Sequence, residues 1–190
     1  MQKFNSDGTF ITKWGSYGTG DGQFHTPQGI TIDTLGNIYI ADTYNHRIQK
    51  FDSNGTFISK WRSEGTNDEQ LQYPRGIIAD SFDDIYVVDS NNDRIQKFSS
   101  DGTFITKWGS YGIGDGQFYC PQGIEIDTDG KIYVADTFNH RIQKFYQTFS
   151  IGGYLKDGSN IAIVGSTITL SGSSSETCIS DSNGYTKFHI

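Results

Sequence analysis

The sequence predicts an all-β protein built from β-propeller blades. Three observations support this fold class: a unit repeats every 47 residues, each unit holds four short runs of strand-forming residues, and turn residues separate the runs. Trp14, Trp61 and Trp108 mark the step of 47 residues. A period in the forties with four strands per unit is typical of propeller blades, because one such sheet cannot bury both faces alone.

The repeat keeps its spacing throughout. Gln-Lys-Phe triplets end at Phe4, Phe51, Phe98 and Phe145 with the same step. Aligning residues 2–48 with residues 96–142 leaves nine differences, so the first and third units are nearly copies. The middle unit departs from them in its loops and carries Asn92-Asp93-Arg94 where the others carry Asn-His-Arg.

The strands of one unit follow from alternation and from β-branched and aromatic content. We expect strands at residues 29–33, 38–42, 47–51 and 56–61. Turn residues lie between them at 35–37, 43–46 and 53–55, where Asn and Gly supply the positive φ that tight hairpins need. No segment of the unit predicts a helix of useful length.

The repeat gives about three blades. The chain opens on a remnant of a third strand at residues 2–4 and a fourth strand at 9–14, continues with two whole blades, and reaches a third strand ending near Phe145. Open blade faces and edge strands are an aggregation hazard. We expect either that the chain is cut from a longer array, or that a homodimer closes the ring, the fourth strand of one copy completing the last blade of the other.

The repeat stops after Phe145, and residues 150–190 are rich in Ser, Gly and Thr. Four short strands are predicted there, at 153–156, 166–170, 176–180 and 185–190. We therefore divide the chain into a propeller segment, residues 1–149, and an incomplete β-sandwich, residues 150–190.

Composition narrows the function classes. The net charge of −7 argues against a nucleic-acid partner, because clustered Lys and Arg supply most of that affinity. No apolar run is long enough to span a membrane, and the N-terminus has no signal-peptide pattern. Cys120 and Cys178 show no metal-binding or disulfide spacing.

Specific segments resemble the NHL repeat family. They include Pro27-Gln28-Gly29-Ile30, Ile38-Tyr39-Ile40-Ala41-Asp42 and Asn45-His46-Arg47-Ile48. In the last segment, Asn-His-Arg stands where the family name has an Asn-His-Leu-like triplet. The resemblance covers about three quarters of the chain and implies blades from a ring of six. The tail resembles a carboxypeptidase-regulatory-like (Ig-like) sandwich through residues 167–170 and 181–188, which implies an extracellular or cell-surface protein.

The Asp-Thr-x-Asn-His-Arg segment of the first and third units offers a carboxylate, an imidazole and a guanidinium, which would suit acid–base catalysis. We interpret the Asp and Arg as structural turn residues instead, because such groups at a tight turn bond to backbone and to each other. They are Asp42 and Arg47, Asp89 and Arg94, and Asp136 and Arg141. No catalytic residue is predicted.

Metal binding by His46, Asp93 and His140, which occupy equivalent positions, is a second possibility. Equivalent positions on adjacent blades splay apart, so we expect no metal and no cofactor. Asp127-Thr128-Asp129-Gly130 lacks the distal glutamate of a calcium loop and predicts a hairpin turn.

Nearly identical units present the same groups twice, whereas catalysis needs one asymmetric set of groups. We therefore predict a non-enzymatic scaffold that binds a protein, peptide or glycan through its rim loops. The candidate binding residues are Tyr44, His46, Asp93, Phe138 and His140. Two alternatives stay open: a lyase or lactonase with a metal in the propeller channel, and a substrate-recruiting propeller related to tripartite-motif ubiquitin ligases.

Overall fold

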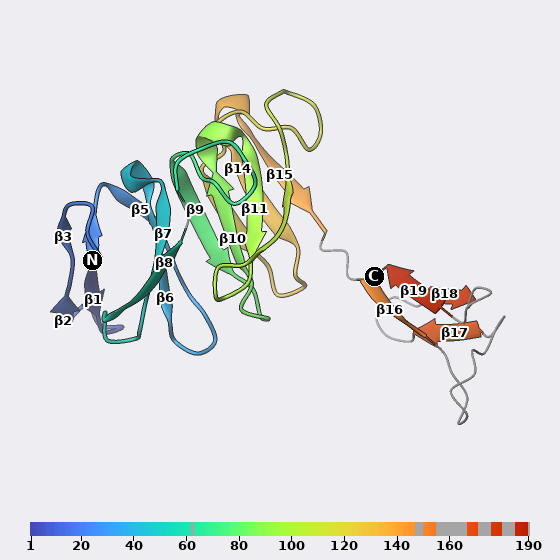
Figure 1. Cartoon of the computed structure of the whole chain (residues 1–190), viewed down its shortest axis with the longest axis horizontal. Coiled ribbons are helices and arrows are strands. Elements are labelled where there is room, and N and C mark those ends of the chain that lie inside the picture. The colour runs from blue at the N-terminus through green and yellow to red at the C-terminus, as the bar shows by residue number, and fades with distance from the viewer. Residues whose placement is uncertain (62, 147–149, 155–166, 171–175, 180–184, 190) are drawn as a thin grey trace. The chain divides into compact units, whose positions relative to one another are not determined.

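A computed structural model confirms the all-β class (Figure 1). It describes the whole chain except residues 62, 147–149, 155–166, 171–175, 180–184 and 190. The chain divides into two compact units, Met1–Phe145 and Tyr146–Ile190. The described residues form no α-helix, only short 3-10 turns. None of these turns is long and apolar enough to cross a membrane.

The first unit contains two complete four-stranded antiparallel sheets and one of three strands, each with its strands in chain order. Blade 1 consists of β5 (Pro27–Ile32), β6 (Ile38–Asp42), β7 (Arg47–Phe51) and β8 (Phe57–Trp61). Blade 2 consists of β9 (Pro74–Ala79), β10 (Ile85–Asp89), β11 (Arg94–Phe98) and β12 (Phe104–Trp108). Blade 3 has β13 (Gly123–Ile126), β14 (Ile132–Asp136) and β15 (Arg141–Phe145).

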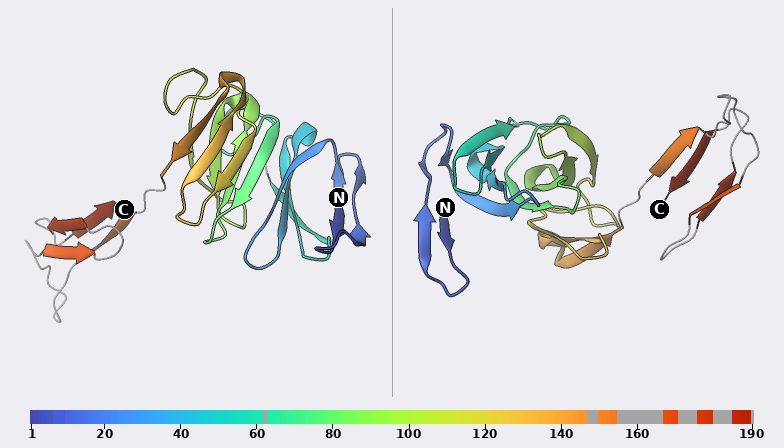
Figure 2. Two further views of the ribbon diagram at one scale, coloured as in Figure 1. Left: turned by 180° about the vertical axis from the view of Figure 1, so that it is seen from behind. Right: turned by 90° about the horizontal axis from the view of Figure 1, so that it is seen from below.

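The predicted fourth strand at the N-terminus forms a hairpin with the third-strand remnant. β1 (Gln2–Phe4) pairs antiparallel with β2 (Phe10–Lys13), and Figure 2 shows this hairpin beside blade 1. The connection to blade 1 contains a short parallel pair, β3 (Ser16–Tyr17) with β4 (Gln23–Phe24), which the repeat pattern did not predict.

The core lies between neighbouring sheets. One buried cluster joins Tyr39, Ala41 and Ile48 of blade 1 to Ile77 and Val87 of blade 2, and a second joins blade 2 to blade 3. Each blade therefore buries its apolar faces by stacking on the neighbouring blade, as is typical of repeat proteins.

Glycine lets the innermost strands come close together. A Cβ added to Gly29 would lie 2.1 Å from the carbonyl oxygen of Arg75, and one added to Gly76 would lie 2.7 Å from that of Gln122. Because both contacts are with backbone, no larger residue fits without moving one strand away from the other.

The second unit contains two antiparallel strand pairs. β16 (Ser150–Tyr154) pairs with β19 (Tyr185–His189), and β17 (Thr167–Leu170) pairs with β18 (Glu176–Ile179). A strand lies at each of the four predicted tail positions, the first beginning three residues earlier than expected. Residues 155–156, 166, 180 and 190 of the predicted strands lie outside the described residues.

Candidate ligand-binding rim

One rim of the blades is built from three equivalent 3-10 turns, which follow the second strand of each blade (Figure 1). They are η1 (Thr43–Asn45), η2 (Ser90–Asn92) and η3 (Thr137–Asn139). The residue after each turn has left-handed backbone geometry: His46, Asp93 and His140 have φ values of 53°, 51° and 54°.

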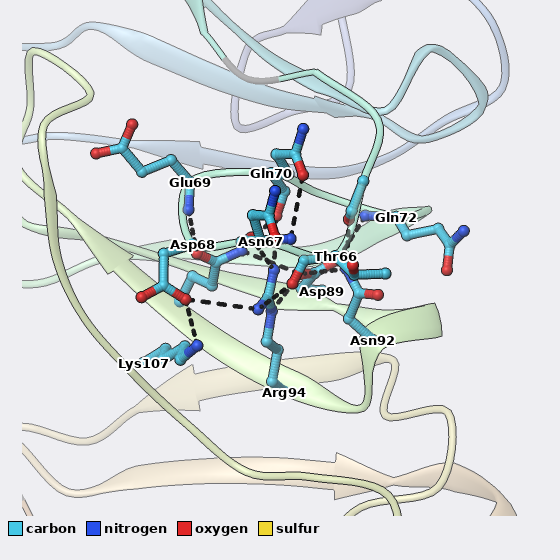
Figure 3. Close-up of polar contacts among 12 residues, drawn as sticks. Thr66, Asn67, Asp68, Glu69, Gln70, Gln72, Asp89, Asn92, Arg94 and Lys107 are labelled. Carbon is cyan, nitrogen blue, oxygen red and sulfur yellow. Dashed lines mark hydrogen bonds and ion pairs between the residues drawn. The ribbon is translucent and has the colours of Figure 1, made fainter.

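A buried carboxylate organises each turn, and Figure 3 shows the arrangement in blade 2. The Asp89 side chain accepts hydrogen bonds from the Gln72 backbone N–H (2.6 Å), Asn92 Nδ2 (2.9 Å), Arg94 Nε (2.7 Å) and Gln96 Nε2 (3.0 Å). Asp89 has no exposed surface. All four donors therefore share one carboxylate that water does not reach.

The same side chains hold the connection that leads into the blade. Arg94 donates to the carbonyl oxygens of Thr66 (3.0 Å), Asn67 (2.7 Å) and Gln70 (2.9 Å). Gln96 Nε2 also donates to the Gln70 carbonyl at 2.6 Å. We call this set, Asp89 with Asn92, Arg94 and Gln96, the loop lock, because it fastens residues 66–72 to the blade.

The loop lock recurs in the other two blades. Asp42 accepts a hydrogen bond from Arg47 Nε, and Asp136 accepts one from Arg141 Nε, both at 2.8 Å. Both arginines also donate to carbonyl oxygens of the preceding connection. The members are Asp42, Asn45, Arg47 and Gln49 in blade 1, and Asp136, Asn139, Arg141 and Gln143 in blade 3. The repeated Asp and Arg thus bond to each other and to backbone. The asparagine and glutamine of each lock were missed, although the repeated Gln-Lys-Phe triplet marks the glutamine.

The residues after the first two turns each fasten one blade to the next. His46 Nδ1 accepts a hydrogen bond from the Tyr73 backbone N–H at 3.1 Å, and Asp93 accepts one from the Cys120 backbone N–H at 2.7 Å. Burial raises the pKa of Asp93, and the charges of Asp136 and Asp89 act in the same direction. Burial likewise raises the pKa of the Cys120 thiol. His140 is exposed, and no described residue bonds to its ring.

These contacts occupy atoms that metal binding by His46, Asp93 and His140 would need. One candidate ligand atom of His46 and one of Asp93 are already used by backbone N–H groups. Across the part of the chain that the structure describes, no three His, Cys, Asp or Glu side chains are grouped as a metal site would require.

Aromatic side chains gather along this rim in two clusters. In the first, the His25 ring contacts Tyr17 and Tyr44 at centroid distances of 5.1 and 5.0 Å, and Tyr73 contacts Tyr44 and His46 at 5.2 and 4.4 Å. The second lies two blades away. There Tyr119 contacts Tyr111 at 5.3 Å and Phe138 at 5.2 Å.

Both clusters are open to solvent. Tyr17 is 79% exposed and Tyr111 is 67% exposed, and Tyr44 and Phe138 are also exposed. At the equivalent positions between the clusters, the middle unit carries the polar residues Glu64, Gln72 and Asn91. The rim therefore presents two aromatic surfaces separated by an acidic and polar one. His25 and Tyr119, the central ring of each cluster, were missed, because their connections predict only a crossing between blades.

Comparison with known proteins identifies the repeat. The NHL repeat family matches residues 24–51, 71–98 and 118–145. Each match begins just before the first strand of a blade and ends with its third strand, so it includes the complete loop lock. The matches end at Phe145, and the resemblance of the tail to a carboxypeptidase-regulatory-like sandwich stays a prediction.

Two curated relatives match a short part of the chain. The B-box type zinc finger protein ncl-1 of Caenorhabditis elegans is 49% identical over 37 residues, and Protein brain tumor of Drosophila melanogaster is 46% identical over 37 residues. Each match covers 20% of this chain and 4% of the relative. The chain thus spans only a small part of either protein.

Solved structures share the fold at low identity. A virginiamycin B lyase from Staphylococcus aureus matches with a TM-score of 0.52 and 16% identity, over 76% of this chain and 47% of its own. A putative phosphatase from Bacteroides thetaiotaomicron matches with a TM-score of 0.54 and 18% identity, over 69% and 37%. The chain spans less than half of either structure, and the likeness shows the propeller-like fold alone.

Proposed function

We propose that the three NHL repeats of this chain form a non-catalytic scaffold that binds a protein or peptide through the rim of the 3-10 turns. The observation that carries the proposal is the pair of exposed aromatic clusters on that rim. Exposed large aromatic rings that touch one another mark interaction sites, because rigid rings offer much apolar area at a small entropic cost.

The loop lock supports binding rather than catalysis. The Asp and Arg of each blade would be the natural acid–base groups, but their hydrogen-bonding atoms are directed at each other and at loop backbone. A carboxylate that accepts four hydrogen bonds in a buried site is poorly placed to exchange a proton with a substrate. These residues hold the loops that carry Tyr17 and Tyr111.

Charge favours a particular kind of partner. The chain has a net charge of −7, and Glu64 and Asp93 belong to the segment between the two clusters. A negative rim repels a phosphate backbone and attracts Lys and Arg side chains, which also stack on aromatic faces. A basic peptide segment therefore fits this rim better than a nucleic acid does.

The test is binding of the full chain to an array of basic and aromatic peptides, followed by titration of the peptides that bind. We expect Tyr17→Ser and Tyr111→Ser each to weaken binding by roughly tenfold, because loss of an interface aromatic costs more than 1 kcal/mol. Phe82→Ser is the matched control, since Phe82 is 69% exposed but lies in the hairpin turn between β9 and β10. Equal loss in all three variants, or binding that none of them changes, would contradict a rim site.

A further inference from the structure

We propose that a second copy of this chain completes blade 3 by strand exchange, with β2 of one copy pairing with β15 of the other. Blade 3 has the first three strands of a blade, and the β1–β2 hairpin supplies a fourth strand. This inference is independent of the proposed function, since it concerns the stacking faces of the blades.

The β1–β2 hairpin occupies the position of the outer strands of a blade that would precede blade 1. Lys3 Nζ donates to the Ser53 carbonyl at 3.1 Å, as Lys50 Nζ of blade 1 donates to the Ser100 carbonyl of blade 2 at 3.0 Å. The Trp14 ring likewise lies against Gly55, as the Trp61 ring lies against Gly102. β2 is therefore held where the fourth strand of a complete blade belongs.

β15 can take the place of β1 without a change of register. Lys3 lies opposite Thr12 and Phe4 opposite Phe10, just as Lys97 lies opposite Thr106 and Phe98 opposite Phe104 in blade 2. β15 carries the same Gln-Lys-Phe residues and is two residues longer than β1. Its Ile142 would add a pairing opposite Trp14 that corresponds to Ile95 opposite Trp108 in blade 2.

The apolar faces at the two ends of the blade stack are complementary. Ile142 is 66% exposed, whereas Ile48 and Ile95 at equivalent positions are fully buried. Ile48 is buried in the cluster that contains Ile77 of the next blade, and the equivalent of Ile77 in blade 1 is Ile30, which is 48% exposed. Exchange would bring Ile142 of one copy against the face that contains Ile30 of the other.

The hydrogen bond that joins neighbouring blades would also form between the two copies. His46 and Asp93 each accept a backbone N–H from a residue 27 positions later, and these residues, Tyr73 and Cys120, have positive φ. Thr26 has the equivalent geometry, with φ of 52°. His140 would accept the Thr26 N–H of the second copy.

Each copy carries both halves of this contact, so exchange in both directions gives a closed two-fold pair. No residue of the second unit is needed for the pairing. A head-to-tail contact that failed to close would instead add copies without limit, and this difference gives the first readout.

The first experiment measures the mass of the full chain by light scattering. The chain weighs 21.2 kDa, so the pair weighs twice that, about 42 kDa. Ile30→Asp and Ile142→Asp should each raise the dissociation constant of the pair at least about 100-fold, because an unpaired carboxylate would be buried. Ile58→Asp is the control, since Ile58 is 49% exposed but lies on an outer strand. A monomer at every concentration, or assemblies that keep growing, would overturn the proposal.

The second experiment tests the exchange itself, in a chain with Cys120→Ser and Cys178→Ser. Adding Lys3→Cys and Thr12→Cys places a disulfide across β1 and β2, since facing residues of paired strands have suitable Cα separations. Oxidation should then hold β1 in place and prevent the pair, and reduction should restore it. Mixing a Thr12→Cys chain with a Lys144→Cys chain should give a disulfide-linked heterodimer. A pair that persists with the hairpin locked uses another surface and refutes strand exchange.

Discussion

Replacing Asp89 with alanine tests whether the loop lock holds the propeller segment together. The change removes the acceptor of four hydrogen bonds. Asn92 and Gln96 each keep a second bond, to the carbonyls of Gly65 and Gln70. The Gln72 backbone N–H and Arg94 Nε lose the partner described above, inside a buried site.

The size of the effect follows from that burial. Breaking a buried ion pair costs about 3–5 kcal/mol, because the remaining charge loses its buried partner. Asp68 lies 3.9 Å from Arg94 Nη1, but it is half exposed and solvent screens the interaction, so it replaces little of what is lost. The Arg94 side chain is only 7% exposed, which leaves little room for water. We therefore expect Asp89→Ala to lower the free energy of unfolding by about 4 kcal/mol.

Asp136→Ala provides the matched comparison. It removes the same interactions, but the Arg141 side chain is 28% exposed, so water can replace part of what is lost. We expect a cost of about 1–2 kcal/mol. Unfolding in urea, followed by tryptophan fluorescence, measures both variants. If Asp89→Ala does not fold, Asp89→Asn retains one acceptor and is measured instead. Equal costs at the two positions, or a cost below about 1 kcal/mol at Asp89, would refute the reasoning.

Two further predictions concern the hairpin turns. Hydrogen bonds from the Ser99 hydroxyl and the Thr103 backbone lower the pKa of Asp101 to about 2, from an ordinary value of 3.8. The stability it contributes is present above pH 4 and is lost as the pH falls towards 2, so Asp101→Asn should flatten the acid-unfolding curve over that interval; an unchanged curve would contradict this. Gly55→Ala should cost more in urea unfolding than Gly36→Ala, which should cost roughly 1–2 kcal/mol. Both glycines have φ above +80°, but a Cβ at residue 55 would lie 2.7 Å from Trp14, whereas at residue 36 the nearest atom lies at 3.8 Å; equal costs would contradict the role of the Trp14 contact.

Much of the fold could be predicted because the same pattern of strand-forming and turn residues recurs in each repeat. The predicted strands at 38–42 and 47–51 coincide with β6 and β7. β5 begins at Pro27, two residues before the predicted start, because the register shifts between Pro27 and Gly29 and the strand continues past the irregularity. Alternation of apolar and polar residues fails at such a point, so it could not indicate this boundary.

The rim was harder to predict than the strands. Tyr44 and Phe138 were recognisable as exposed turn residues, but His25 and Tyr119 belong to connections that arrive from the preceding blade. The role of Gln49 was hidden for the same reason, since it bonds to the backbone of Gly22 and Gln23 across 26 or 27 positions. Contacts of this kind depend on how blades stack, which a single repeat does not specify.

The way Arg94 and its counterparts hold each connection has a consequence for sequence variation. Their guanidinium groups bind carbonyl oxygens, which every amino acid has, and so place little demand on the side chains of the loop. The middle unit illustrates this, since Asn67, Glu69 and Leu71 stand where the first unit has Gly20, Gly22 and Phe24, and the lock is intact. A loop whose shape is set by its backbone can exchange its outward-facing residues while the blade beneath stays unchanged. Copies of one repeat can therefore acquire different surfaces, as the aromatic and polar segments of this rim have done.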